Sequence, residues 1–143
     1  MLGTSMAKLC ATALLIKDFR IALDDGRSHS VCVDLQIDEG SDMGPTPLEL
    51  CVMSFAGCYA IIFALTAKKM RIQLKKLNVR LEAVETEEAG TITEASLDIK
   101  VKADASQDRI DRLHKLTMKN CPVGKLFEKA GVKTRYKIQA EKQ

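Results

Sequence analysis

Aromatic residues are scarce in this chain of 143 residues, which has no Trp, two Tyr and four Phe. Proteins that bind single-stranded nucleic acid stack the bases on aromatic side chains, so the composition disfavours that class. The charge also disfavours a nucleic-acid partner, because 22 basic and 19 acidic residues leave a formal net charge of only +3. An excess this small favours solubility over a polyanionic partner. We therefore expect no nucleic-acid partner.

Recognisable metal and hydrolase motifs are also lacking. The five cysteines form no CxxC pair, and no zinc-ligand spacing joins them to the two histidines. No Ser/His/Asp arrangement, phosphate loop or paired carboxylate is visible, which disfavours hydrolase and nucleotide-binding functions. An odd number of scattered cysteines is atypical of a secreted disulfide scaffold. We therefore expect reduced thiols, a cytoplasmic location, and neither a metal nor an organic cofactor.

Long apolar runs are few. The run near the N-terminus is only about eight residues long and no small-residue cleavage site follows it, so we expect no signal peptide. A longer stretch without any charge extends from Leu50 to Ala67, a length at the lower limit of a membrane span. A helix that is apolar all round can equally be the buried centre of a domain or dimer. Because the other segments look like amphipathic strands that need a partner surface, we favour burial over a membrane.

Hydrophobic patterns divide the chain into strands and helices. They predict strands at residues 8–16, 18–24, 29–36, 76–85, 92–103 and 132–140. Asp25-Gly26, between the second and third strands, is a two-residue hairpin signal. Hydrophobic periodicity and helix-terminus signals predict helices from 47 to about 70, from Ser106 to near Asn120, and from Cys121-Pro122 to just before Gly131. This order predicts one α+β domain over residues 1–143 with an antiparallel sheet, and residues 1–7 as a flexible start.

The start of the long helix has a clear capping signal. Thr46 suits the N-cap, Pro47 suits the first helical position, and Glu49 completes a capping box three residues after the cap. Inward-facing positions are predicted for the second hairpin and the helix after Ser106 at Leu77, Val79, Leu81, Ala83, Ala95, Leu97, Ile99, Val101, Ile110, Leu113 and Thr117.

Cys121 has a local reason to be reactive. It stands at a predicted helix N-terminus, where the helix dipole and free N–H groups lower the pKa of a thiol and favour the thiolate. Lys119 and Lys125 add positive charge nearby. The alternative is a cysteine that serves only as the N-cap residue, and the residues alone leave both readings open.

The other cysteines have a simpler interpretation, because free cysteine packs like a small hydrophobic residue. We expect this packing role for Cys10, Cys32 and Cys51. It is also the simplest interpretation of Cys58, which lies in the middle of the long helix. Cys51 precedes Cys58 by two helical turns, too far for a disulfide, whose Cα atoms must come within about 7 Å.

Two segments together resemble the OsmC/Ohr family of organic hydroperoxide reductases: GPTPLELCVMSFAGCYAI at 44–61 and NCPVGKLFEKAG at 120–131. The family pattern is a Gly-x-x-Pro helix start, a cysteine eleven residues after that proline, and a second cysteine in a Cys-Pro motif. Cys58 follows Pro47 by eleven residues, and Cys121-Pro122 supplies the second motif. The resemblance implies an intertwined homodimer with the long helices buried at its centre.

The resemblance also implies a mechanism. Cys58 would be the peroxidatic thiolate that attacks the distal oxygen of a hydroperoxide, which releases the alcohol and leaves a sulfenic acid. Cys121 would resolve it as a disulfide, which an external dithiol reduces. A buried Cys58 needs a compensating cation, because desolvation raises the pKa of a thiol. The family uses an Arg from the first strands, steadied by the Glu at the helix start.

The Glu and the Arg that assist the peroxidatic cysteine in the best-studied members have no exact equivalents in this sequence. Leu48 stands where those members have the Glu, and Glu49 comes one residue later, about 100° further around the helix. Other branches carry this Pro-x-Glu arrangement. Arg20 and Arg27 are the candidate arginines. Arg20 is preferred because it lies just after the first strand, opposite the apolar face of Phe19 and Ile21, whereas Arg27 sits beside the hairpin turn.

The resulting prediction is a thiol-dependent peroxidase that reduces organic hydroperoxides through Cys58 and Cys121 in oxidative stress defence, with Glu49 and Arg20 as helpers. Its alternative is an OsmC-like homodimer without this activity that binds an apolar small molecule.

Overall fold

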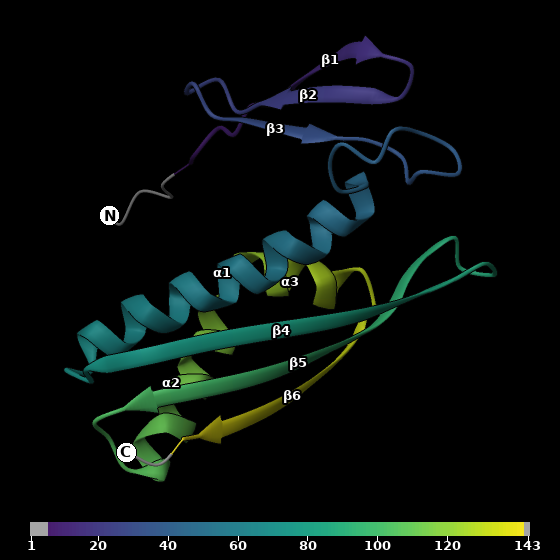
Figure 1. The fold of residues 1–143 in the computed structure, drawn as a ribbon. Helices are drawn as coiled ribbons and strands as arrows, with labels where there is room; N and C mark the ends of the chain where they lie inside the picture. The colour runs from purple at the N-terminus through teal and green to yellow at the C-terminus, as the bar shows by residue number, and fades with distance from the viewer. Residues whose placement is uncertain (1–5, 142–143) are drawn as a thin grey trace. The chain divides into compact units, whose positions relative to one another are not determined.

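The predicted order of strands and helices is confirmed in a computed structural model that describes residues 6–141 (Figure 1). The elements are β1 (Thr12–Lys17), β2 (Arg20–Asp24), β3 (Ser30–Val33), α1 (Pro47–Lys69), β4 (Leu74–Thr86), β5 (Thr91–Ala103), α2 (Gln107–Asn120), α3 (Pro122–Lys129) and β6 (Lys133–Ala140). The α+β class is therefore confirmed. Of the predicted flexible start at 1–7, residues 1–5 lie outside the described part of the chain.

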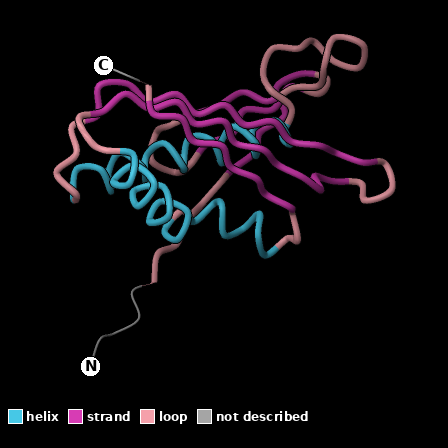
Figure 2. Tube along the Cα trace, turned by 90° about the horizontal axis from the view of Figure 1, so that it is seen from below, coloured by secondary structure: helices cyan, strands magenta, loops and turns pink. Residues whose placement is uncertain are grey.

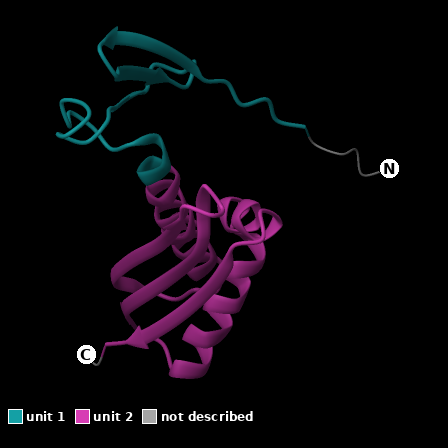
Figure 3. Cartoon of the chain, turned by 90° about the vertical axis from the view of Figure 1, so that its right-hand side faces the viewer, with its two compact units in different colours: residues 1–50 teal, residues 51–143 magenta. Residues whose placement is uncertain are grey.

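The chain divides into two compact units, residues 1–50 and residues 51–143 (Figure 3). The first unit holds β1, β2, β3 and the first turn of α1, and the second unit holds the rest of α1 and all later elements. Cys58 and Cys121 lie in the second unit, whereas Glu49 and Arg20, the residues predicted to assist them, lie in the first unit. That a single domain covers the whole chain stays a prediction.

In the first unit, β1, β2 and β3 pair antiparallel in sequence order. The predicted two-residue hairpin turn is wrong, because β2 ends at Asp24 and the loop 25–29 precedes β3. The Asp24 carboxylate accepts the Gly26 N–H at 2.6 Å, and the Asp25 carboxylate accepts the Arg27 N–H at 2.8 Å. These side-chain bonds satisfy the loop backbone and stabilise a wider turn.

In the second unit, β5 lies between β4 and β6. β4 and β5 pair antiparallel as predicted, but β6 pairs parallel to β5, so the antiparallel prediction is wrong for this strand. The cause is the connection: α2 and α3 lie between β5 and β6, and a crossover of this length returns the chain to the end of the sheet where β5 began. The helices of this unit lie on one face of the sheet (Figures 2 and 3).

The core of the second unit lies between that face and the helices. The inward positions predicted on β5 and α2 are confirmed as buried: Ala95, Leu97, Ile99, Val101, Ile110, Leu113 and Thr117. α1 adds a stripe at every fourth residue: Phe55, Tyr59, Phe63 and Ala67. Its opposite face leaves Met53, Ile61 and Leu65 exposed in the single chain. By length and composition alone α1 could also cross a membrane, and 22% of its most apolar window is buried in the single chain. In its aromatic stripe, Phe55 packs on Phe127 of α3 and Tyr59 packs on Tyr136 of β6.

Candidate active site

The sulfur atoms of Cys58 and Cys121 lie 3.4 Å apart, although 63 residues separate them in the sequence. Cys58 lies on α1 beside the buried stripe, and Cys121 stands between α2 and α3, where it caps both. Its backbone is extended, with φ −79° and ψ 106°, because the following Pro122 disfavours the helical conformation at the preceding residue. The Cys-Pro step therefore ends α2, starts α3 and places the thiol against α1.

Cys121 is buried, with 1% of its surface exposed, and the Gly124 N–H donates to its Sγ at 3.4 Å. Burial raises the pKa of the Cys121 thiol to about 11; the Gly124 and Val123 N–H groups lower it, and the neighbouring Cys58 raises it further. The predicted lowering at the helix N-terminus is therefore wrong, since desolvation outweighs the backbone N–H groups. At neutral pH the thiol keeps its proton and donates it to Cys58 Sγ.

Cys58 is half-buried and so more accessible than Cys121, which corrects the expectation of a buried Cys58. Cys10 and Cys51 are exposed in the single chain and Cys32 is half-buried, so within one chain the expected packing role is not found for Cys10 or Cys51. Of the five thiols, Cys58 and Cys121 are the two that lie in contact with each other.

A hydrogen bond joins α1 to α2 next to the cysteine pair. Tyr59 Oη and His114 Nδ1 lie 2.5 Å apart, and the Tyr136 ring packs edge-on against His114 at a centroid distance of 5.2 Å. Burial raises the pKa of Tyr59 far above its usual value and lowers the pKa of His114. Both groups are therefore neutral at pH 7, so the hydrogen bond between the Tyr59 hydroxyl and the imidazole joins two uncharged groups. The sequence prediction gave His114 no role, because no local pattern links residues 55 positions apart.

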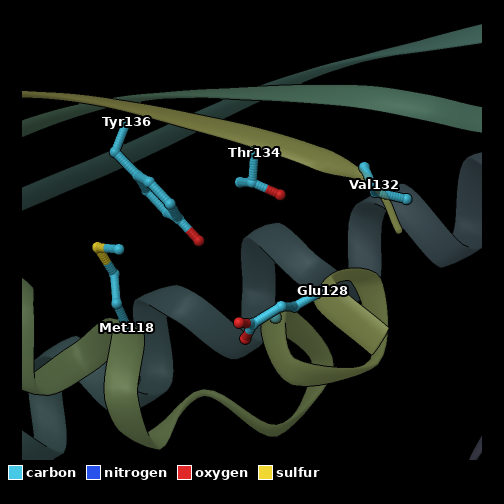
Figure 4. Close-up of a pocket in the computed structure, with 6 residues that line it drawn as sticks. Met118, Glu128, Val132, Thr134 and Tyr136 are labelled. Atoms are coloured by element: carbon cyan, nitrogen blue, oxygen red, sulfur yellow. The ribbon is translucent and has the colours of Figure 1, made fainter. Parts of the chain in front are cut away.

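A cavity of about 240 Å³ lies between β6 and α3 in the second unit, lined by Met118, Gly124, Glu128, Val132, Thr134 and Tyr136. The hydroxyl groups of Tyr136 and Thr134 and the carboxylate of Glu128 point toward the same space (Figure 4). Gly124 connects this cavity to the cysteine pair, because it lines the cavity and its N–H donates to Cys121 Sγ. The sequence prediction missed the cavity, whose lining residues come from α2, α3, β6 and the connection between α3 and β6.

Glu49 forms the predicted capping box. The Thr46 N–H donates to Glu49 Oε2 at 2.8 Å, and the Glu49 N–H donates to Thr46 Oγ1 at 3.2 Å. The bond from the Thr46 N–H is the main reason why the pKa of Glu49 is lowered. Glu49 belongs to the first unit and the cysteine pair to the second, so its catalytic role stays a prediction.

Arg20 pairs with a buried carboxylate in the first unit. Its Nε lies 3.7 Å from Oδ2 of Asp34, which is 2% exposed. Burial would raise the pKa of Asp34, but N–H donors, led by that of Leu35, and the charge of Arg20 outweigh it and lower the pKa. Arg27, the other candidate, is exposed and lies 3.7 Å from Asp25. The assignment of Arg20 to Cys58 therefore stays a prediction.

The contact between the Cys58 and Cys121 sulfur atoms allows thiol–disulfide chemistry at this site. Among residues 6–141, no three His, Cys, Asp or Glu side chains gather closely enough to hold a metal ion. A protonated thiol beside a second, more accessible sulfur is suited to forming and breaking a disulfide.

Solved structures with a similar fold include an OsmC-like protein from Mycoplasma pneumoniae, with a TM-score of 0.85 and 17% sequence identity over 95% of this chain and 99% of that one. The organic hydroperoxide resistance protein OhrB of Bacillus subtilis aligns with a TM-score of 0.64 and 17% identity over 94% of this chain and 100% of that one. A further organic hydroperoxide resistance protein, from Legionella pneumophila, aligns with a TM-score of 0.70 and 16% sequence identity. This alignment covers 95% of this chain and 99% of that one. At these identities the likeness shows a shared fold.

A comparison with curated protein sequences gave no match. The family model described as OsmC-like protein matches residues 39–137, which include the start of α1 and both cysteines of the pair. With more than half of its length matched by this model, the chain belongs to the family of OsmC-like proteins.

Proposed function

We propose that this protein is a thiol-dependent peroxidase that reduces organic hydroperoxides to alcohols through a sulfenate–disulfide cycle at Cys58 and Cys121. The observation that carries the proposal is the contact between the two sulfur atoms at 3.4 Å. A disulfide bond is about 2.05 Å long, so closing the pair from 3.4 Å requires a movement of about 1.4 Å. Family membership adds support, since members of this fold include proteins named for organic hydroperoxide resistance.

The first step belongs to the more accessible cysteine. The Cys58 thiolate attacks the terminal oxygen of the hydroperoxide, so that an S–O bond forms, the O–O bond breaks and an alkoxide leaves. The Cys121 thiol donates a hydrogen bond to this sulfur. An alkoxide is a much stronger base than a thiolate, so proton transfer from Cys121 to the leaving group runs downhill and yields the alcohol.

The second step uses the thiolate that this transfer creates. The N–H groups of Gly124 and Val123 stabilise the negative charge on Cys121. Its sulfur then attacks the Cys58 sulfenic acid, so that the S–S bond forms and hydroxide leaves and is protonated to water. A high resting pKa thus suits Cys121 to store the proton until the peroxide bond breaks.

An external dithiol completes the proposed cycle by reducing the disulfide, so that the protein itself needs no bound cofactor. The protein would act as a homodimer in the cytoplasm, in the defence against oxidative stress. These parts of the proposal come from the family resemblance and from the composition of the chain.

The test is thiol loss and peroxide consumption with cumene hydroperoxide, using dithiothreitol as the dithiol. We expect the wild-type protein to lose two thiols and to form a Cys58–Cys121 disulfide detectable by mass spectrometry. Cys58→Ser should abolish turnover, whereas Cys121→Ser should still allow one sulfenic acid to form, which dimedone traps. The matched control Cys51→Ser removes an exposed thiol outside the pair and should keep full turnover.

Two results would overturn the proposal. One is a wild-type protein whose two thiols stay free under excess hydroperoxide, which would favour the alternative of a dimer that binds an apolar small molecule. The other is equal residual turnover in Cys58→Ser and Cys121→Ser, which would contradict the distinct roles of the two sulfur atoms.

A further inference from the structure

Side-chain hydrogen bonds tie α1 to α2 at the end of α1, in its middle and at the sulfur pair. Near the end of α1, Arg109 Nη2 donates to the Met70 carbonyl oxygen at 2.6 Å. In the middle, Tyr59 Oη and His114 Nδ1 lie 2.5 Å apart. At the sulfur pair, the contact comes from Cys121, which caps the C-terminus of α2. The Tyr59–His114 bond lies next to the pair, yet the proposed cycle gives it no role.

The sulfur contact depends on how α1 is rotated about its own axis. The helix has no charged residue from Leu50 to Ala67, and apolar packing is not directional. A side chain reaches about 5 Å from the axis of its helix, so a rotation of about 10° moves the Cys58 sulfur by about 0.9 Å. A thiol is a weak hydrogen-bond donor, so the sulfur contact does not fix this rotation by itself.

Tyr59 supplies a directional contact at this point of α1. It follows Cys58 directly, points about 100° away from it around the helix, and is 0% exposed. Its hydroxyl reaches His114 only within the narrow range of distances and angles that a hydrogen bond allows, and a buried hydroxyl without a partner is strongly disfavoured. The bond therefore fixes the rotation of α1 one residue from the sulfur.

His114 is itself held in place, so it can serve as the anchor of this bond. The Tyr136 ring of β6 packs edge-on against the imidazole at a centroid distance of 5.2 Å and lies 6.1 Å from the Tyr59 ring. Two helical turns separate His114 from Cys121 along α2. The same helix therefore presents both the imidazole and the thiol to α1.

We propose that Tyr59 and His114 are positioning residues that hold the Cys58 sulfur against the Cys121 sulfur for disulfide formation. The inference rests on the proposed function, because it concerns the step in which Cys121 resolves the sulfenic acid. Without the bond, α1 samples other rotations in the reduced protein, whereas the disulfide fixes the two sulfur atoms by itself. Loss of the bond should therefore make the disulfide less favourable relative to the two thiols.

The experiment measures the equilibrium of the Cys58–Cys121 pair with dithiothreitol in the folded protein, by differential alkylation and mass spectrometry. Diamide first oxidises the pair by accepting the two thiol hydrogens, so the measurement needs no peroxidase activity. One dithiothreitol then becomes its cyclic disulfide for each protein disulfide that becomes two thiols. We expect Tyr59→Phe, which removes only the hydroxyl, to lower the equilibrium constant for the protein disulfide about fivefold, the size expected for one hydrogen bond of ordinary net strength.

Variants of the partner separate positioning from general stability. His114→Phe should lower the constant as much as Tyr59→Phe, and the double variant should lower it no further. His114→Gln, which keeps a hydrogen-bonding side chain, should retain most of the wild-type value. The matched control Arg109→Ala breaks the bond to Met70, about 18 Å along α1 from Cys58. It should lower the melting temperature without changing the constant.

An unchanged constant in folded Tyr59→Phe or His114→Phe would overturn the inference, and so would an equal drop in Arg109→Ala. The absence of a Cys58–Cys121 disulfide after diamide would overturn it as well. The bond can be removed from either side, so a variant that fails to fold leaves the decision to its partner. A disulfide that forms with diamide but not with hydroperoxide would instead refute the proposed function, and the same constants would still decide the inference.

Discussion

At the residue scale, the two cysteines of the site differ in burial and in protonation. Cys121 is buried and its thiol is held protonated, whereas Cys58 is half-buried and receives the hydrogen bond. A hydroperoxide reaches the accessible sulfur more easily, and a buried thiol is protected from direct oxidation. The difference therefore favours Cys58 as the peroxidatic residue and Cys121 as the resolving one.

The protonation of Cys121 can be measured from the ultraviolet absorbance of thiolates during a pH titration. We expect the difference between the wild-type protein and Cys121→Ser to show a transition near the pKa of about 11 that burial produces. Cys51→Ser serves as the control for a thiol outside the pair. A difference curve for Cys121→Ser that rises near neutral pH would show that the helix N-terminus, and not burial, governs this thiol.

His114 should make stability depend on pH between 7 and 5. Burial lowers its pKa in the folded protein, so the unfolded chain binds the proton more readily. Stability is therefore full above the unfolded value of about 6.5 and falls as the pH drops through it. We expect the melting temperature to fall more over this range in the wild-type protein than in His114→Gln, which keeps a hydrogen-bonding side chain for Tyr59 but does not titrate.

The matching control is His29→Gln, because His29 is an exposed histidine that pairs with Asp25. It should leave the wild-type slope of melting temperature against pH nearly unchanged. Identical slopes for wild type and His114→Gln would show that the half-buried imidazole does not contribute.

At the element scale, α1 is held by different interactions along its length. The capping box of Thr46 and Glu49 satisfies backbone N–H groups at its start, and the Tyr59–His114 hydrogen bond ties its middle to α2. The second of these interactions lies one residue from Cys58, so it also limits rotation of the helix that carries the sulfur proposed as peroxidatic.

The capping box and the proposed catalytic role of Glu49 make different predictions. Thr46→Ala should lower the free energy of unfolding by about 1 kcal/mol. Glu49→Gln should change it by only a few tenths of a kcal/mol, since Gln can also occupy this position of a capping box. Urea unfolding measures both. If the charge of Glu49 serves Cys58, Glu49→Gln lowers the rate with hydroperoxide at unchanged stability; an unchanged rate limits Glu49 to capping.

At the scale of the whole molecule, large apolar side chains remain exposed in the single chain. On α1 they are Met53, Ile61 and Leu65, each more than half exposed. In the first unit, β1 exposes Leu14, Leu15 and Ile16, and the turn after it exposes Phe19. A three-stranded sheet needs a packed hydrophobic face, and large exposed apolar patches mark interaction surfaces. A second copy of this chain is the partner that the family resemblance implies.

We therefore expect the protein to sediment as a homodimer in analytical ultracentrifugation. Ile61→Glu, at a residue 63% exposed in the single chain, should weaken the dimer by placing a charge in a buried apolar interface. Val84→Glu, at another exposed apolar residue, on β4, serves as the matched control. A monomeric wild-type protein, or equal dissociation in both variants, would contradict an interface on α1.

Much of the fold follows from local patterns in the sequence. The capping box at Thr46, the alternation along β4 and β5, and the inner face of α2 are all found in the structure. Each depends on residues a few positions apart, whose backbone preferences and periodicity act without the rest of the chain. The parallel direction of β6 was not predictable in this way, because it depends on where the α2–α3 crossover returns the chain.

The sequence by itself determined that two cysteines stand in a family pattern and that the Cys121-Pro122 step divides two helices. Tertiary structure alone decided that the two sulfur atoms meet, that Tyr59 bonds to His114, and that Gly124, the hydrogen-bond donor to Cys121, lines a cavity with one carboxylate. It also reversed the expected pKa of Cys121. The physical reason is desolvation: the effect of a helix N-terminus can be read from neighbouring residues, but burial is produced by side chains from distant parts of the chain.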